Sequence, residues 1–108
     1  MVTKQQVYEV ACFMRRLEED KSIRIAFENL DGIYGLVYKG HNSKFLMIIN
    51  KNICYEKQLE TIWHEAKHIY SHADSSPGDI KIFEKEAVEF SKIAIKYPEI
   101  LALCRNAW

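Results

Sequence analysis

The sequence predicts an α+β fold. An amphipathic segment at the N-terminus precedes three short apolar runs separated by turn signals, and two further helical patterns follow these runs. This order of helix, strands and helices is typical of α+β domains. The chain has 108 residues, the size of one domain, so we expect a single domain over residues 1–108.

The first predicted element is a helix capped by Thr3. Its apolar residues recur at helical spacing and define one face, which we expect to pack on the core: Val7, Val10, Ala11, Met14 and Leu17. The helix should end near the polar sequence EEDKS.

Three strands are expected next, over residues 23–27, 33–38 and 44–50. The first alternates apolar and polar residues, and the turn signals NLDG and KGHNS separate the three runs. Consecutive strands joined by such short turns favour a meander. We therefore expect a small antiparallel sheet of three strands.

Two long helical patterns follow the strands. One runs from about Glu56 to Ala73, and a polar turn signal with adjacent proline and glycine ends it at residues 74–79. The second starts near Ile80 and stops before Pro98, because the residue before a proline disfavours helical backbone angles. The terminal sequence PEILALCRNAW is compatible with one short helix.

Composition and charge argue against several classes of function. Lys and Arg together number 15, as do Asp and Glu, so the chain lacks the basic bias of proteins that bind nucleic acid directly. No apolar run is long enough to span a membrane, and the N-terminus lacks the apolar core of a signal peptide. We therefore expect a cytoplasmic protein without a membrane partner. Three cysteines without a CxxC pair give no support to a disulfide framework or a catalytic thiol.

The sequence TIWHEAKHIYSH, residues 61–72, carries the clearest chemical signal. On a helix, His64, Glu65 and His68 project within an arc of about 100°, beside a continuous apolar arc. HEAKH matches the pattern HExxH, in which two histidines one turn apart bind zinc. The glutamate points beside the metal, where it can take a proton from water. We therefore predict that His64 and His68 bind zinc and that Glu65 is the catalytic base.

Other interpretations of this helix are a solvated polar stripe and a structural zinc site. Structural sites favour cysteine and fill all four positions, which argues against the second. His72 extends the motif by one turn, but on a straight helix it lies too far along the axis to share one ion with His64 and His68. It could instead face the substrate, or interact only with the helix dipole. His41 falls in a predicted turn.

Three segments together resemble the ImmA/IrrE family of zinc metallopeptidase-like proteins. They are IIN at residues 48–50, TIWHEAKHIYSH at residues 61–72 and EKEAVEF at residues 84–90. Members of that family have an I-x-I-N-like strand end, a T-x-x-H-E-x-x-H helix and a later E-x-E-A-x-x-F-A segment. The chain departs from the pattern at Lys67, where the family usually has glycine, and at Ser91, where it has alanine.

The resemblance implies a minimal, gluzincin-like zincin core in which His64, His68 and Glu86 bind zinc and Glu65 is the base. It also implies a zinc metalloendopeptidase of the bacterial cytoplasm, typical of phages and mobile elements. The expected partner is a DNA-binding repressor with a helix-turn-helix domain, which the enzyme would cleave. The alternative is an anti-repressor that binds this partner with little or no proteolysis, with zinc mainly holding the fold.

The helical pattern also favours Glu86 as the third zinc ligand, ahead of Glu84 and Glu89. A catalytic zinc needs a third protein ligand and an open position for water. Glu86 projects into the middle of the apolar stripe of its helix, whereas the other two glutamates project away from the middle. A carboxylate in such a position needs a charged or metal partner. Arg24 is the alternative partner.

The remaining expectations concern the substrate. An exposed strand, such as the one that ends at Asn50, could hold the substrate backbone by strand addition. Tyr34, Tyr38 and Tyr70 are candidates to stabilise the oxyanion, although each is also compatible with a position in the core or at a rim.

Overall fold

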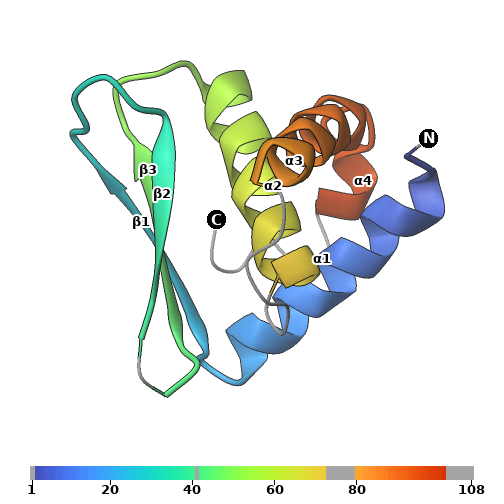
Figure 1. Cartoon of the computed structure of the whole chain (residues 1–108), viewed down its shortest axis with the longest axis horizontal. Helices are drawn as coiled ribbons and strands as arrows, with labels where there is room; N and C mark the ends of the chain where they lie inside the picture. The colour runs from blue at the N-terminus through green and yellow to red at the C-terminus, as the bar shows by residue number, and fades with distance from the viewer. Residues whose placement is uncertain (1, 41, 73–79, 102–108) are drawn as a thin grey trace.

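The computed structural model describes residues 2–40, 42–72 and 80–101. Its elements are, in chain order, α1 (Lys4–Glu19), β1 (Ile23–Glu28), β2 (Gly35–Lys39), β3 (Phe45–Asn50), α2 (Tyr55–His72), α3 (Ile80–Ala94) and α4 (Pro98–Leu101). The strands form one sheet on one side of the molecule, and the helices lie on the other side (Figure 1). The predicted α+β class is therefore confirmed.

The first helix forms as its sequence predicts. Thr3 Oγ1 accepts a hydrogen bond from Gln6 N at 3.2 Å, and Gln6 Oε1 accepts one from Thr3 N at 2.9 Å. This reciprocal capping box satisfies two backbone donors at the start of α1. The apolar face of α1 is buried at Val7, Val10, Ala11 and Met14.

The predicted antiparallel meander is wrong, although its three strands are present. The strand order is β1-β3-β2, so β3 lies in the centre, parallel to β1 and antiparallel to β2. The sequence of β3, FLMIIN, is the most apolar and the most deeply buried of the three. A central position covers both edges of this strand, which leaves the more polar β1 and β2 at the exposed edges. The chain therefore passes from β1 to the far edge before the hairpin returns it to the middle.

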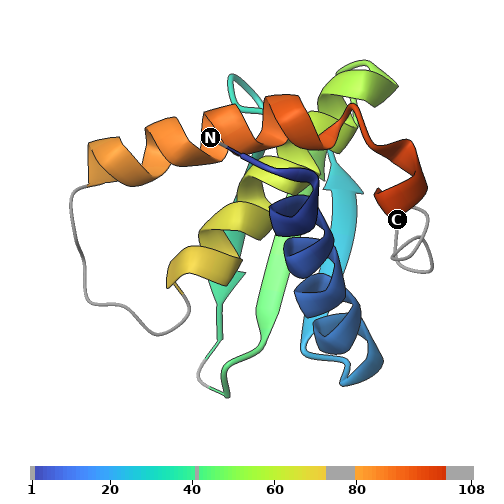
Figure 2. The ribbon, with the colours of Figure 1, turned by 90° about the vertical axis from the view of Figure 1, so that its right-hand side faces the viewer.

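The core lies between the sheet and the helices. Met47 and Ile49 of β3 are fully buried, as are Trp63 of α2 and Phe90 of α3, whose rings make an edge contact at 5.8 Å between centroids. α3 crosses α2 (Figure 2), and α1 contacts α2 and β1. This crossing decides which α3 side chains reach the HExxH motif on α2.

The helix ends differ from the predicted bounds by a few residues. α2 covers nearly the predicted range, but α3 ends at Ala94 and not directly before Pro98. Turn hydrogen bonds follow, from Lys96 N to Ile93 O at 3.1 Å and from Tyr97 N to Ala94 O at 3.0 Å.

Some predictions lie outside the described residues, namely those for the turn at residues 74–79, for His41 and for the end of the C-terminal helix. In the part of the chain that the structure describes, no helix combines the length and the apolar character that crossing a membrane requires.

Candidate metal centre

The histidines of the motif lie on α2 at the border between its buried face and its exposed face. Ile62, Trp63 and Ala66 are buried in the core, whereas the side chains of His64 and His68 are 18 % and 25 % exposed. The helix therefore holds both imidazoles at its surface, one turn apart, as the sequence pattern predicts. Their ring centroids are 4.9 Å apart.

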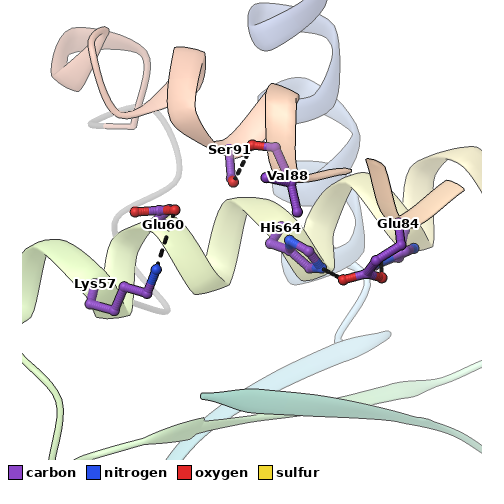
Figure 3. A network of polar contacts seen from close by, with 7 residues as sticks. Lys57, Glu60, His64, Glu84, Val88 and Ser91 are labelled. Atoms are coloured by element: carbon purple, nitrogen blue, oxygen red, sulfur yellow. Dashed lines mark hydrogen bonds and ion pairs between the residues drawn. The ribbon is translucent and has the colours of Figure 1, made fainter. Parts of the chain in front are cut away.

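Glu84 of α3 contacts both histidines. Its Oε1 atom lies 2.8 Å from His64 Nε2, and its Oε2 atom lies 2.9 Å from His68 Nε2. Figure 3 shows His64 and Glu84 pointing toward each other from their two helices. One ligand atom from each of the three side chains lies within 4.8 Å of the others, so these residues could hold a metal ion.

The chemistry of this donor set fits zinc. Two imidazole nitrogens and a carboxylate are common ligands of a catalytic zinc, which keeps its fourth position open. Each Nε2 atom must carry a proton to donate to Glu84, and a cation in this space would take the place of those protons. Without those protons, a lone pair on each Nε2 atom and a carboxylate oxygen of Glu84 would face the ion.

Glu86, the carboxylate predicted as the third ligand, does not reach the histidines. It is exposed and lines a separate cavity of about 530 Å³, together with Lys67 and Tyr70. The prediction centred the apolar stripe of α3 on Glu86, but from Glu84 onward, where the side chains of this helix are described, the buried residues are Ala87, Phe90, Ser91 and Ala94. Relative to the middle of this buried face, Glu84 and Glu86 project to opposite sides, at about 70° and 90°.

The residue that the resemblance suggested is therefore displaced by two positions. Glu84 is the first glutamate of the E-x-E-A segment and Glu86 is the second. The crossing of α3 over α2 turns the Glu84 side of α3 toward the histidines. The angle between two helices depends on packing between distant residues, so the sequence of α3 alone could not reveal this choice.

Glu65 lines the same cleft as His64 and Glu84 and is partly buried. Burial raises the pKa of the Glu65 carboxyl above its ordinary value, His68 lowers this pKa, and Glu84 raises it further. A raised pKa moves a carboxyl closer to the range in which it can both accept and return a proton at neutral pH.

A cleft of about 500 Å³ extends from His64 and Glu84 along α2. Its floor is one face of α2, and its two walls come from the start of β2 and from α3. The residues on the walls are Ile33, Tyr34 and Gly35 on one side and Glu84, Val88, Ser91 and Lys92 on the other. Figure 3 shows Lys57, Glu60 and His64 in succession on α2, with Val88 and Ser91 above them. Of the three predicted tyrosines, Tyr34 lines this cleft, whereas Tyr70 lines the separate cavity.

The wall formed by β2 approaches α2 closely at Gly35. A Cβ atom at this position would lie 2.7 Å from Thr61 Cγ2 and 3.0 Å from Ile48 O. Thr61 is buried, and its Oγ1 atom donates to Lys57 O at 2.7 Å. Sequence reasoning missed Gly35, although a glycine at the start of a predicted strand is a signal of close backbone approach.

The strand beside the cleft is β2 and not the strand that ends at Asn50. β3 is central and both of its edges are paired, so the suggestion that it binds substrate is wrong. Asn50 N donates to Tyr34 O at 2.8 Å. In an antiparallel pair the bonding direction alternates, so Gly35 and Val37 direct their backbone groups away from β3, toward the edge of the described sheet.

No family model, curated protein or solved structure matches the chain. His72 is the last residue of α2, and its side chain lies outside the described residues. The features of the described chain that indicate a function are therefore the cluster of His64, His68 and Glu84 and the cleft beside it.

Proposed function

We propose that the protein is a zinc metalloendopeptidase in which His64, His68 and Glu84 hold the metal. The observation that carries this proposal is the convergence of two imidazoles and one carboxylate at a cleft that also contains Glu65. Zinc bound by these residues would supply Lewis-acid chemistry to a peptide carbonyl and to water. The same ion would join α2 to α3.

Glu65 is the proposed general base. It follows His64 directly and lines the cleft without belonging to the group of three converging side chains. Its carboxylate would take a proton from the attacking water and return it to the leaving amine. The burial that raises its pKa supports the first of these transfers, because a carboxylate with a higher pKa is a stronger base.

The proposed path of the substrate follows the edge of β2. An extended peptide could pair with the outward backbone groups of Gly35 and Val37 by strand addition, since these groups do not pair with β3. Tyr34 lines the cleft and is 55 % exposed. Its hydroxyl is therefore the candidate to donate to the carbonyl oxygen as negative charge develops on that atom.

The identity of the substrate depends on the resemblance alone. The ImmA/IrrE pattern suggests a cytoplasmic repressor with a helix-turn-helix domain, and a minimal zincin core as the fold. The displacement from Glu86 to Glu84 weakens this resemblance, whereas the order of strands, HExxH helix and glutamate-bearing helix agrees with it. A repressor encoded beside this protein is the substrate to test first.

The test combines purified protein, zinc and the candidate repressor, with cleavage products identified by mass spectrometry. We expect cleavage that a chelator abolishes. Glu65→Gln should bind zinc as the wild type does. It should cleave the substrate at least about 100-fold more slowly, because general-base catalysis contributes at least that factor. A stable complex without cleavage would indicate the anti-repressor alternative. A protein that binds no zinc would contradict both.

A further inference from the structure

Asn50 is one of the few buried polar residues of the described chain, and it lies at the end of β3. Its Nδ2 atom donates to Leu30 O at 2.9 Å and to Ile33 O at 3.0 Å. Its Oδ1 atom accepts a hydrogen bond from Asn52 N at 2.9 Å. Both amide protons and the carbonyl oxygen of the side chain are therefore used within the protein.

The backbone of Asn50 makes two further connections. Its N–H donates to Tyr34 O at 2.8 Å, and its carbonyl oxygen accepts from Gln58 Nε2 at 3.2 Å. Gln58 belongs to the first turns of α2. One residue thus joins the segment between β1 and β2, the start of the edge strand and the helix that carries the histidines.

The segment that Asn50 holds leads into one wall of the cleft. Ile33 and Tyr34 line this wall, yet their side chains are 45 % and 55 % exposed. Such exposed side chains bury little apolar area, so packing contributes little to keeping this wall in place. The hydrogen bonds to the carbonyl groups of Leu30 and Ile33 restrain this segment, in addition to the contact of Lys57 Nζ with the Tyr34 ring, 4.7 Å from its centroid.

We propose that Asn50 is a positioning residue that sets the spacing between the β2 wall of the cleft and the helix that carries the histidines. The anchoring follows from the hydrogen bonds above. Only its consequence for substrate binding rests on the proposed function. Substrate contacts the wall during binding, whereas His64, His68 and Glu84 belong to α2 and α3. Loss of the anchor should therefore weaken the binding of substrate more than the binding of zinc.

The chemistry of this position is specific to asparagine. The site requires two donors toward the carbonyl groups and one acceptor toward Asn52 N. Ionised aspartate has the same shape but only acceptors, so it would oppose both carbonyl groups while keeping the bond to Asn52. Asn50→Asp therefore removes the anchor of the wall with little change in volume.

The experiment compares Asn50→Asp with Asn52→Asp, which makes the same change of charge two residues later. Asn52 is exposed, and its Nδ2 atom contacts Asn29 Oδ1 and not the wall of the cleft. Asn50→Ser is a second variant, since serine is too short to reach both carbonyl groups and adds no charge. Hydrogen exchange, zinc content and, with a cleaved substrate, KM and kcat are measured on each zinc-loaded protein.

We expect exchange over residues 30–36 to be at least about tenfold faster in both Asn50 variants, because two partly buried hydrogen bonds that hold this segment are lost. Asn52→Asp should exchange as the wild type does. Zinc content should be unchanged in every variant, and KM should rise about tenfold in the Asn50 variants with kcat little altered.

Wild-type exchange over residues 30–36 in both Asn50 variants would overturn the anchoring. Losses of zinc content and of kcat as large as the rise in KM would overturn the positioning role, because that pattern indicates general unfolding. If the wild type cleaves no substrate, the proposed function fails by itself. Hydrogen exchange and zinc content still decide whether Asn50 holds the wall of the cleft without affecting zinc binding by His64, His68 and Glu84.

Discussion

Glu84 and Glu86 lie two positions apart on α3 and face different parts of the molecule. Glu84 contacts both histidines, whereas Glu86 lines a separate cavity. Replacing Glu84 by glutamine preserves size but removes the charge that would face a cation. We expect Glu84→Gln to weaken zinc binding by more than about 100-fold, because changes to outer-shell partners already cost about 10- to 100-fold. Competition with a chromogenic chelator measures this affinity.

Glu86→Gln is the matched control for that experiment, since it changes the same residue type on the same helix. Its zinc affinity should equal that of the wild type. The reverse result, with loss of zinc in Glu86→Gln alone, would restore the ligand expected from the sequence pattern and contradict the crossing of α3 over α2.

Glu65 gives a pH-dependent prediction for the metal-free protein. Its pKa is raised in the folded state, mainly by burial, relative to an unfolded value of about 4.3. The folded state therefore binds this proton more tightly, and stability falls as pH rises from the unfolded pKa through the folded pKa. Glu65→Gln removes this loss, so in chelator its melting temperature should exceed that of the wild type at neutral pH.

The difference should disappear near pH 4 and below, where the Glu65 carboxyl is largely protonated in both states. Thermal melts across this pH range test the prediction. Glu56→Gln is a useful comparison, because Glu56 lies on the same helix but is exposed. A variant of Glu65 that melts at the wild-type temperature at every pH would show that the carboxyl is well solvated.

At the scale of elements, the contact between β2 and α2 depends on Gly35. Gly35→Ala would place a Cβ atom 2.7 Å from Thr61 Cγ2, so either the strand or the helix must shift. We expect a loss of about 1–3 kcal/mol in the free energy of unfolding, as for other overpacked sites. Urea unfolding measures the loss.

A double variant tests the cause of that loss. Thr61→Ser removes the Cγ2 methyl group but keeps the hydroxyl that donates to Lys57 O. Gly35→Ala combined with Thr61→Ser should recover part of the lost stability. Recovery should be incomplete, because Ile48 O would still lie 3.0 Å from the new Cβ atom. Strictly additive effects of the two substitutions would contradict a direct clash.

At the scale of the whole molecule, a bound metal would connect two helices that otherwise meet through packing and through the contacts of Glu84 with His64 and His68. α2 supplies His64 and His68, and α3 supplies Glu84. An ion that binds only the folded state contributes about 2.7 kcal/mol at a concentration 100 times its Kd. For a domain of this size, we expect zinc to raise the melting temperature by on the order of 10 °C.

Calorimetry with and without chelator measures this shift. In Glu84→Gln the shift should largely disappear, because only the two histidines of α2 would then remain to bind the ion. A full shift in that variant would place the metal elsewhere in the chain.

The amino-acid sequence by itself determined the local features of this protein. The N-cap at Thr3, the apolar face of α1 and the surface position of His64 and His68 on α2 all depend on residues a few positions apart. Helical periodicity and capping act over that range, which is why these features were predictable. The three strands were located within two residues because apolar runs and turn signals are also local features of the sequence.

Only the tertiary structure decided which of these elements meet. β3 occupies the middle of the sheet because its apolar residues are covered there, which makes β2 the strand beside the cleft. Glu84 meets the histidines because α3 crosses α2 at an angle set by side chains from both helices. Asn50 and Gly35 acquire their roles from partners distant in the sequence, Leu30 and Thr61 among them. Such contacts depend on the simultaneous packing of all elements, which no local pattern encodes.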